Sequence, residues 1–127
     1  LYGLIGSRCL LVATHANEAG REVVIGMNMY YLNARDVREK TIHEGFIGVI
    51  PGMTGKGIAS TMRNMAKEHF KAARFKGIST RISLNNAPSL QSAKKMGFTP
   101  VEEYTEPSTG ERRYYMVAKL IETHAKQ

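Results

Sequence analysis

The sequence lacks the features of several protein classes. It holds a single cysteine, Cys9, which excludes an intramolecular disulfide framework and a cysteine-rich zinc site, so no metal is expected. Its apolar runs are far shorter than the roughly 20 residues of a membrane-spanning helix. Its first residues carry no charged segment ahead of an apolar core, so we expect no signal peptide. These absences fit a reducing compartment, and we expect a cytoplasmic protein with no membrane partner.

The charge of the chain is concentrated in its middle. The 127 residues are 43% hydrophobic and 23% charged, which predicts one globular domain over residues 1–127. Residues 51–100 contain nine Lys and Arg and a single acid, Glu68, whereas the flanking segments are close to neutral. A like-signed segment of this size attracts anionic ligands. A solvated helix face has the same composition, and nucleic acid is a third interpretation.

The hydrophobic pattern predicts a mixed α/β (α+β) fold with the order β-β-β-α-β-α-β-β. The expected strands are residues 8–15, 22–33, 41–50, 78–84, 98–104 and 113–121, and the expected helices are residues 58–74 and 86–96. Polar residues 34–40 are expected to form a loop. We therefore expect a largely antiparallel sheet with helices packed on it.

Two details of the expected strands bear on the core. In the second strand, alternation places one row of apolar side chains on one face, namely Val23, Ile25, Met27, Met29 and Tyr31. In the third strand the alternation slips near residues 45–47, where Gly45 and Gly48 lie. This slip indicates a β-bulge.

A glycine-rich turn, residues 52–57, joins the third strand to the first long helix. Such a turn is typical of an anion site, because unpaired N–H groups and the helix dipole both favour negative charge. A Walker A loop does not fit, because Gly52 is only three residues before Gly55 and Lys56 is followed by Gly57. A dinucleotide fingerprint fits poorly, because Ser60 stands where its third glycine belongs. A tight turn with no role in binding is also an open interpretation.

Two motifs resemble those of the GNAT superfamily of acetyl-CoA-dependent N-acetyltransferases. The first is Val49-Ile50-Pro51 followed by Thr54-Gly55-Lys56-Gly57-Ile58-Ala59, against the family's Arg/Gln-x-x-Gly-x-Gly/Ala. Gly57 and Ala59 match this signature, and Thr54 departs from its leading Arg or Gln. The second motif is Asn86-Ala87-Pro88-Ser89 and then Met96-Gly97-Phe98, at the family's spacing.

The resemblance covers residues 8–120 and implies an N-terminally abbreviated GNAT-like domain. The family's first strand and first helices have no counterpart before Arg8. We therefore expect residues 1–7 to be the tail of a lost helix, in a truncated domain or a piece of a longer protein.

By resemblance, the chain moves an acetyl group from acetyl-CoA to a primary amine by direct attack in a ternary complex. The cofactor would lie between strands 41–50 and 78–84, with the backbone N–H of Val49 at the developing oxyanion. His43 and Glu44 stand where the family often carries a base, and family habit favours Glu44. The cofactor-binding residues implied are Ile47, Val49, Thr54, Gly55, Lys56, Gly57, Ile58, Ala59, Asn86 and Ser89.

The general acid is not supplied by the family's usual position. There the family often has a Tyr, and this chain has Ala93 with Ser92 beside it. Tyr104, Tyr114 or Tyr115 could substitute from the last two strands. A thiol can also leave as the thiolate, so an acid is not obligatory.

Two alternatives stay open. A catalytically weak or inactive CoA-binding GNAT module is one, and a basic nucleic-acid-binding domain is the other. The low aromatic content, 8%, and the lack of a stacking platform disfavour nucleic acid. As an acceptor we expect a small-molecule or peptide amine, and exposed strand edges suggest a homodimer. The last hairpin is acidic, which suits a cationic amine, at Glu102, Glu103, Glu106 and Glu111.

Overall fold

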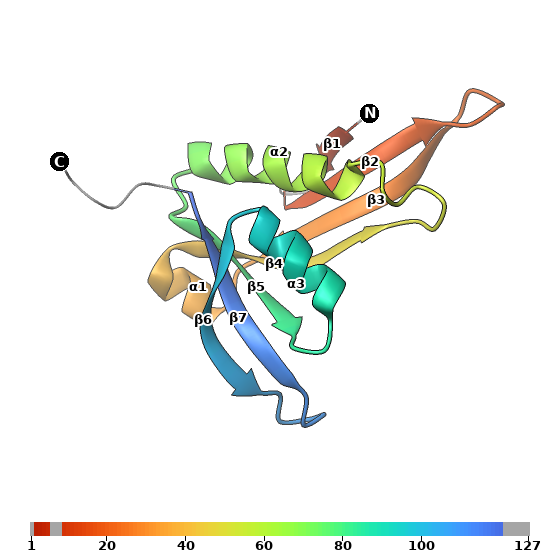
Figure 1. Cartoon of the computed structure of the whole chain (residues 1–127). Coiled ribbons are helices and arrows are strands. Elements are labelled where there is room, and N and C mark those ends of the chain that lie inside the picture. Colours follow the sequence, from red (N-terminus) through yellow and green to blue (C-terminus); the bar gives the residue numbers. More distant parts are fainter. Residues whose placement is uncertain (1, 6–8, 121–127) are drawn as a thin grey trace.

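The computed structural model describes residues 2–5 and 9–120, and of residues 2–5 the backbone only. Figure 1 shows a twisted sheet with helices on both sides. The elements are β1 (Tyr2–Ile5), β2 (Leu10–Ala16), β3 (Glu22–Tyr31), α1 (Ala34–Glu39), β4 (Thr41–Val49), α2 (Ile58–Ala72), β5 (Gly77–Ser83), α3 (Ala87–Lys95), β6 (Phe98–Thr105) and β7 (Arg112–Lys119).

The sheet has seven strands in the order β1-β2-β3-β4-β5-β7-β6. Every neighbouring pair is antiparallel except β4 and β5, which confirms the expected mixed, largely antiparallel sheet. The β4–β5 pairing is short, because it joins only Thr41–His43 to Gly77–Ser79. Beyond these residues the two strands separate, and the sheet is open at its centre.

Two segments differ from the expectations of the sequence. Residues 34–40, expected to be a loop, contain helix α1, because Asn33 caps it and Asp36 completes a reciprocal capping box. Residues 2–5 form a strand paired with β2, so the expectation of a helix tail was wrong there. The end of the last expected strand, residue 121, lies outside the described residues.

The single apolar row expected on β3 was also wrong, because Ile25 is buried whereas Met27 and Met29 are exposed. The register of β2 and β3 shifts between Ala13 and Thr14, so Ile25 is an extra residue on β3. A one-residue shift moves the residues that follow it to the other face. Asn28 and Tyr30 are therefore buried and Met29 is 39% exposed. The expected bulge in β4 is confirmed, because the register shift there leaves Gly45 unpaired.

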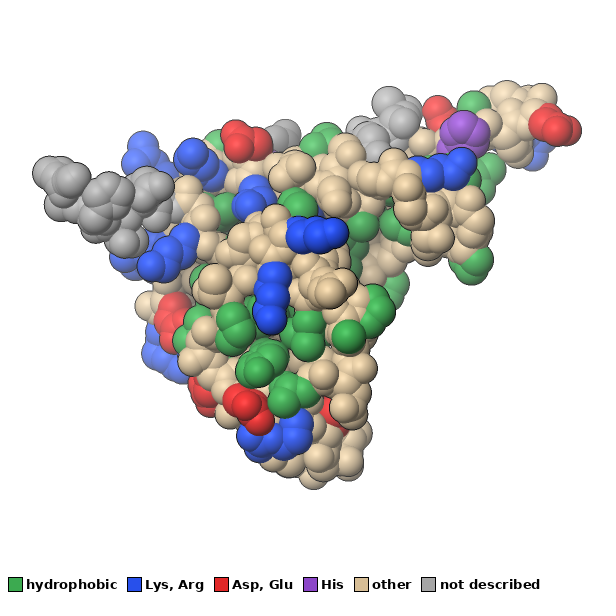
Figure 2. Space-filling view, viewed as in Figure 1, with side chains coloured by type: hydrophobic (Ala, Val, Ile, Leu, Met, Phe, Trp, Pro, Cys, Tyr) green, Lys and Arg blue, Asp and Glu red, His purple; other side chains and the backbone are tan. Residues whose placement is uncertain are grey.

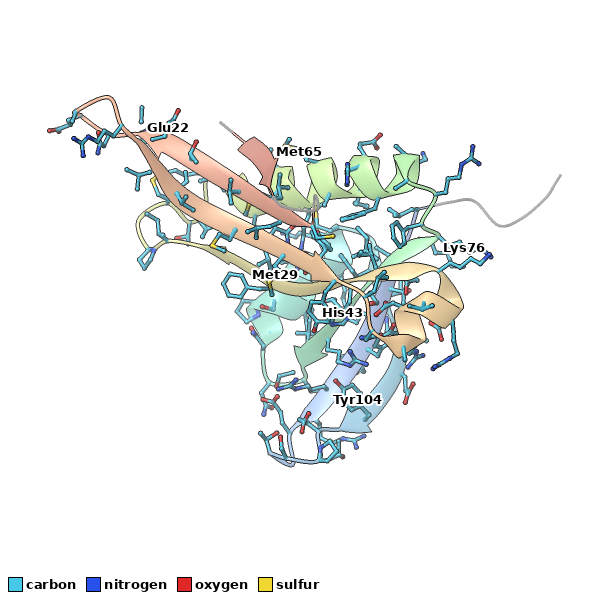
Figure 3. The ribbon with its side chains drawn as sticks, turned by 180° about the vertical axis from the view of Figure 1, so that it is seen from behind. Glu22, Met29, His43, Met65, Lys76 and Tyr104 are labelled. Carbon is cyan, nitrogen blue, oxygen red and sulfur yellow. The ribbon has the colours of Figure 1, made fainter. Side chains whose placement is uncertain are left out.

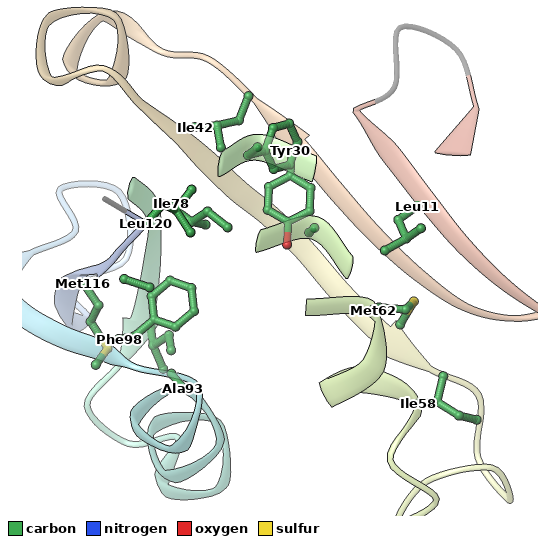
Figure 4. Close-up of a cluster of buried hydrophobic side chains, with 14 of the residues drawn as sticks. Leu11, Tyr30, Ile42, Ile58, Met62, Ile78, Ala93, Phe98, Met116 and Leu120 are labelled. Atoms are coloured by element: carbon green, nitrogen blue, oxygen red, sulfur yellow. The ribbon is translucent and has the colours of Figure 1, made fainter. Parts of the chain in front are cut away.

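Helices α2 and α3 cover one face of the sheet, and the core lies beneath them (Figures 1 and 4). Figure 4 shows two groups of core side chains, one under α2 and one between α3 and the C-terminal strands. Helix α1 lies on the opposite face, where Asp36 bonds Thr41 and Ser79. The most deeply buried of the large apolar side chains are Leu11, Tyr30, Ile42, Met62, Phe70, Ile78, Phe98, Tyr115 and Met116.

The opposite face is covered by α1 only at one end. Its uncovered part carries exposed apolar side chains from β3 and β4, namely Met27, Met29, Tyr31 and Phe46. Figure 3 shows this face with Met29 and His43 labelled. Within the described ranges, no helix is long and apolar enough to cross a membrane.

Candidate active site

The site is built around the opening between β4 and β5. The Ile50 amide donates to the Ile25 carbonyl of β3 at 2.9 Å. Because successive residues of a strand point their amides to opposite sides, the amides of Val49 and Ile47 point away from β3. They face the side on which β5 has already separated from β4. This stretch of β4 therefore offers a backbone edge to a ligand.

A cavity of about 480 Å³ lies along this edge. Its walls come from β4, the glycine-rich loop and the two long helices. A cavity of this size falls in the range that holds small ligands and cofactors. Its lining residues are Ile47, Gly48, Val49, Thr54, Gly55, Ala59, Arg63, Pro88, Ser89 and Ser92.

The glycine-rich loop positions the N-terminus of α2 beside this cavity. Gly55 and Gly57 both have φ 77°, a left-handed conformation that favours glycine. Gly57 is the N-cap of α2, and α2 has no side-chain cap and no acidic residue in its first turn. The first N–H groups of α2 and its dipole are thus available to an anion.

Glu44 lies at the floor of the opening in a buried polar network. Its carboxylate accepts two bonds from Arg63, from Nη2 at 2.8 Å and from Nε at 3.0 Å. Asn28 Nδ2 donates to the same carboxylate at 3.0 Å. Burial and the nearby carboxylate raise the pKa of the Tyr30 phenol, which donates to Asn28 at 2.6 Å. Both oxygens of Glu44 are therefore held in fixed positions.

His43 points to the opposite face and belongs to a second chain of hydrogen bonds. Ser79 Oγ donates to Asp36 at 2.7 Å, so it accepts from His43 Nδ1, also at 2.7 Å. This bonding leaves Nε2 of His43 as an acceptor. Burial, and then the charge of Arg81, lower the pKa of His43. The imidazole is consequently neutral at physiological pH.

A sequence model described as the acetyltransferase (GNAT) family matches residues 5–98. The chain belongs to the GNAT family. None of the curated protein sequences compared with the chain matches it significantly.

Solved GNAT structures have the same fold. Nourseothricin acetyltransferase superposes with a TM-score of 0.70 at 19% identity, over 89% of this chain and 66% of its own length. The NatC complex bound to Gag peptide and CoA superposes with a TM-score of 0.78 at 15% identity, over 90% of this chain and 72% of the matched chain. The yncA protein of Salmonella typhimurium was solved with its cofactor acetyl-CoA. It superposes with a TM-score of 0.71 at 20% identity, over 93% of this chain and 68% of its own length.

The structure of this GNAT chain brings most of the expected cofactor residues together. Gly57 and Ile58 line an adjoining cavity of about 210 Å³ that shares Val49, Thr54, Gly55 and Ala59 with the larger one. Asn86 caps α3 by accepting from the Ser89 amide at 3.2 Å. Lys56 is exposed in the loop and lines neither cavity.

The expected catalytic candidates are separated by the sheet. His43 and Glu44 point to opposite faces, and only Glu44 lines the opening between β4 and β5. Ala93 belongs to α3 and is fully buried. Ser92 beside it accepts from Arg63 Nη1 at 3.1 Å. Among the described residues, no cluster of three His, Cys, Asp or Glu is placed to hold a metal ion.

The sequence did not predict the polar residues that form hydrogen bonds around His43 and Glu44. A helical period of 3.6 residues predicts that Arg63 lies away from the core face of α2, yet its side chain is 6% exposed. Asn28 and Tyr30 were missed because the bulge at Ile25 reverses the face of β3. Asp36 and Ser79 were missed together, because their contact depends on α1. The one available signal was Asn33-x-x-Asp36, which is a capping-box pattern.

Proposed function

We propose that the chain transfers an acetyl group from acetyl-CoA to a primary amine. The observation that carries the proposal is the opening between β4 and β5, with an unpaired strand edge on one side and the uncapped N-terminus of α2 at its end. Acetyl-CoA supplies an activated thioester, which a neutral amine attacks directly to form an amide and release the CoA thiolate.

The residues present fit this cofactor. The first turn of α2 would hold the pyrophosphate, since it offers backbone donors and has no acidic side chain. The edge of β4 at Ile47 and Val49 would pair with the amide groups of the pantetheine, as an added strand does. Figure 2 shows Lys and Arg side chains on the face of the molecule where α2 and α3 lie. The last turns of these helices contain Lys71, Lys94 and Lys95. Their charge favours capture of an anionic cofactor.

We assign two roles in the chemistry. The amide of Val49 points into the opening, so it would donate to the oxygen that becomes negative during attack. The carboxylate of Glu44 lines the same opening, and it would accept the proton of the amine through water. His43 has no place in this step, because it lies on the opposite face, outside the residues that line the opening.

Two predictions of the sequence remain proposals beside this function. A cytoplasmic location rests on the single cysteine, and a homodimer rests on the exposed strand edges.

Titration of acetyl-CoA by calorimetry tests the cofactor site. We expect micromolar binding that weakens for dephospho-CoA and with added salt, because both changes weaken charge attraction. Ser60→Glu places a carboxylate in the first turn of α2, where Ser60 is exposed beside the loop. This variant should bind acetyl-CoA at least about tenfold more weakly, because the carboxylate repels the pyrophosphate.

The matched control is Asn64→Glu, which adds the same charge one turn later at another exposed position of α2. An acid near a helix N-terminus stabilises the helix, so loss of binding in the first variant cannot be explained by loss of stability. Equal binding by both variants would contradict the proposed site. Binding of acetyl-CoA with no acetylation of any amine would instead indicate a CoA-binding module.

A further inference from the structure

We propose that the acceptor amine carries a carboxylate, and that Arg81 binds this carboxylate. This inference rests on the proposed acetyl transfer and names the class of its second substrate.

A cavity of about 300 Å³ passes through the opening in the sheet. On the side of α2 and α3 it is lined by Glu44, Arg63 and Ser89. Arg81 and Ser83 also line it, and they point to the opposite face with their β7 partners. A ligand on the opposite face therefore reaches the same opening as one bound between the helices.

Arg81 is the unpaired charge of this cavity. Arg63 is neutralised by Glu44, and Arg113 bonds Glu111 at 2.6 Å. Within the described part of the chain, no acid forms an ion pair with Arg81. The lining thus leaves one positive charge without a counterion.

Three of the four acids of the last hairpin are paired with arginines. Glu102 bonds Arg35 at 2.8 Å, and Glu103 bonds Arg112. Glu111 is bonded to Arg113, and Glu106 accepts from Ser108. At Glu102, Glu103 and Glu111 the negative charge expected to attract a cationic amine is therefore already balanced by an arginine.

The Arg81 guanidinium is held in place by aromatic rings. It lies 4.9 Å from the centroid of Tyr115 and 5.9 Å from that of Tyr104. Cation–π contacts of this kind orient a guanidinium without neutralising it. Its remaining N–H donors match the two oxygens of a carboxylate, and one guanidinium balances one negative charge.

Two aromatic side chains lie on the β4 side of the opening, where Phe46 lines the cavity and Tyr31 packs against Gly45 beside it. A Cβ at Gly45 would overlap the Tyr31 ring, and a Cβ at Gly48 would meet the Phe46 ring at 2.7 Å. Both rings therefore lie against β4 on the face that Arg81 shares, and both are about half exposed. A charged anchor facing apolar rings fits an amino acid with an apolar side chain better than a polyamine.

The test compares amino acids with their amides as acceptors. We would measure CoA release with L-phenylalanine and L-methionine, and with L-phenylalaninamide and L-methioninamide. Amidation removes the negative charge and leaves more of the amine neutral, so amine basicity alone would favour the amides. We expect kcat/KM to be at least about tenfold higher for the free acids.

Arg81→Gln should remove this preference by lowering kcat/KM for the acids about 10-fold to 100-fold while leaving the amides unchanged. Arg81→Lys should retain part of the preference. Arg112→Gln is the matched control, because Arg112 is exposed and pairs with Glu103 away from the cavity. It should leave both rates unchanged.

A binding measurement separates this inference from the proposed function. N-acetyl-L-phenylalanine and its amide are titrated into the protein saturated with CoA, and the acid should bind more tightly. Equal binding, or amides acetylated as well as acids, overturns the role of Arg81 and leaves acetyl transfer standing. Failure of acetyl-CoA itself to bind overturns both proposals.

Discussion

Glu44 and Arg63 form a buried ion pair at the centre of the candidate site, with side chains 2% and 6% exposed. Removing one partner of such a pair leaves an uncompensated buried charge. Arg63→Met should therefore lower the free energy of unfolding by about 3–5 kcal/mol, measured by urea denaturation. The double variant Glu44→Gln/Arg63→Met should be less destabilised than the sum of its single variants, because the two residues share one interaction.

The exposed pair of Arg112 and Glu103 is the control for this measurement. Arg112→Met should cost less than about 1 kcal/mol, since exposed ion pairs contribute little. Glu44 pairs with Arg63 and is also proposed to accept the proton of the amine. A measurement of acetyl-CoA binding distinguishes these two roles. Glu44→Gln should lower the rate of acetyl transfer and keep the affinity for acetyl-CoA, provided that the assay runs below its unfolding temperature. Additive effects of the two core variants would show that they do not interact.

Arg63 also shows what a sequence does not reveal at the scale of one residue. Helical periodicity assigns the long basic side chains Arg63 and Lys71 to the outside of α2, and Lys71 is exposed as expected. Whether such a side chain is buried depends on a partner, and Glu44 is 19 positions away in the chain. Arg81 was missed for the same reason, because its environment is made by strands that meet only in the folded sheet.

At the scale of elements, helix α1 depends on its cap. Asn33 Oδ1 accepts from the Asp36 amide at 3.0 Å, and Asp36 accepts in return from the Asn33 amide. Asn33→Ala should lower the free energy of unfolding by about 1 kcal/mol, the usual contribution of an N-cap. Asn64→Ala in α2 is the control, and its stability should stay equal or rise slightly because alanine favours helix. Equal urea midpoints for the two variants would contradict the role of the cap.

The elements that sequence reasoning predicted well are those with local signals. The glycine-rich turn, the Asn86 cap and Gly97 bound α2 and α3 within one or two residues of their expected ends. The bulge in β4 was predicted because its alternation visibly slips there. The bulge at Ile25 left no such trace, because the residues around it are apolar on both faces. The bulge therefore divides the expected row from Val23 to Tyr31 between the two faces of the sheet.

At the scale of the whole molecule, the two halves of the sheet are joined at a narrow junction. Only three residue pairs connect β4 to β5, and α1 covers this junction on the opposite face. His43 is buried there, 3% exposed, between Ser79 and the rings of Tyr31 and Tyr115. The packing at this junction favours a neutral imidazole, because His43 bonds the Ser79 hydroxyl and no acid among the described residues forms an ion pair with it.

The stability of the molecule should consequently depend on the charge of His43. Burial, and then Arg81, lower the pKa of His43 below its ordinary value of 6.5, against the weaker opposing effects of Asp36 and Glu44. As pH falls below 6.5, the unfolded chain binds a proton that the folded chain binds only at lower pH. The contribution of a neutral His43 to the free energy of unfolding is therefore complete above pH 6.5 and declines below this pH.

Urea denaturation from about pH 5 to 8 measures this dependence. His43→Asn retains a donor toward Ser79 and cannot titrate, so its stability should change less between pH 6.5 and the acid end of the range. His15→Asn is the control, because His15 is exposed on β2 and its variant should follow the parent chain. If His43→Asn loses stability toward acid as steeply as the parent chain, the free energy of unfolding does not depend on the charge of His43. Another group, on another element, would then account for the slope.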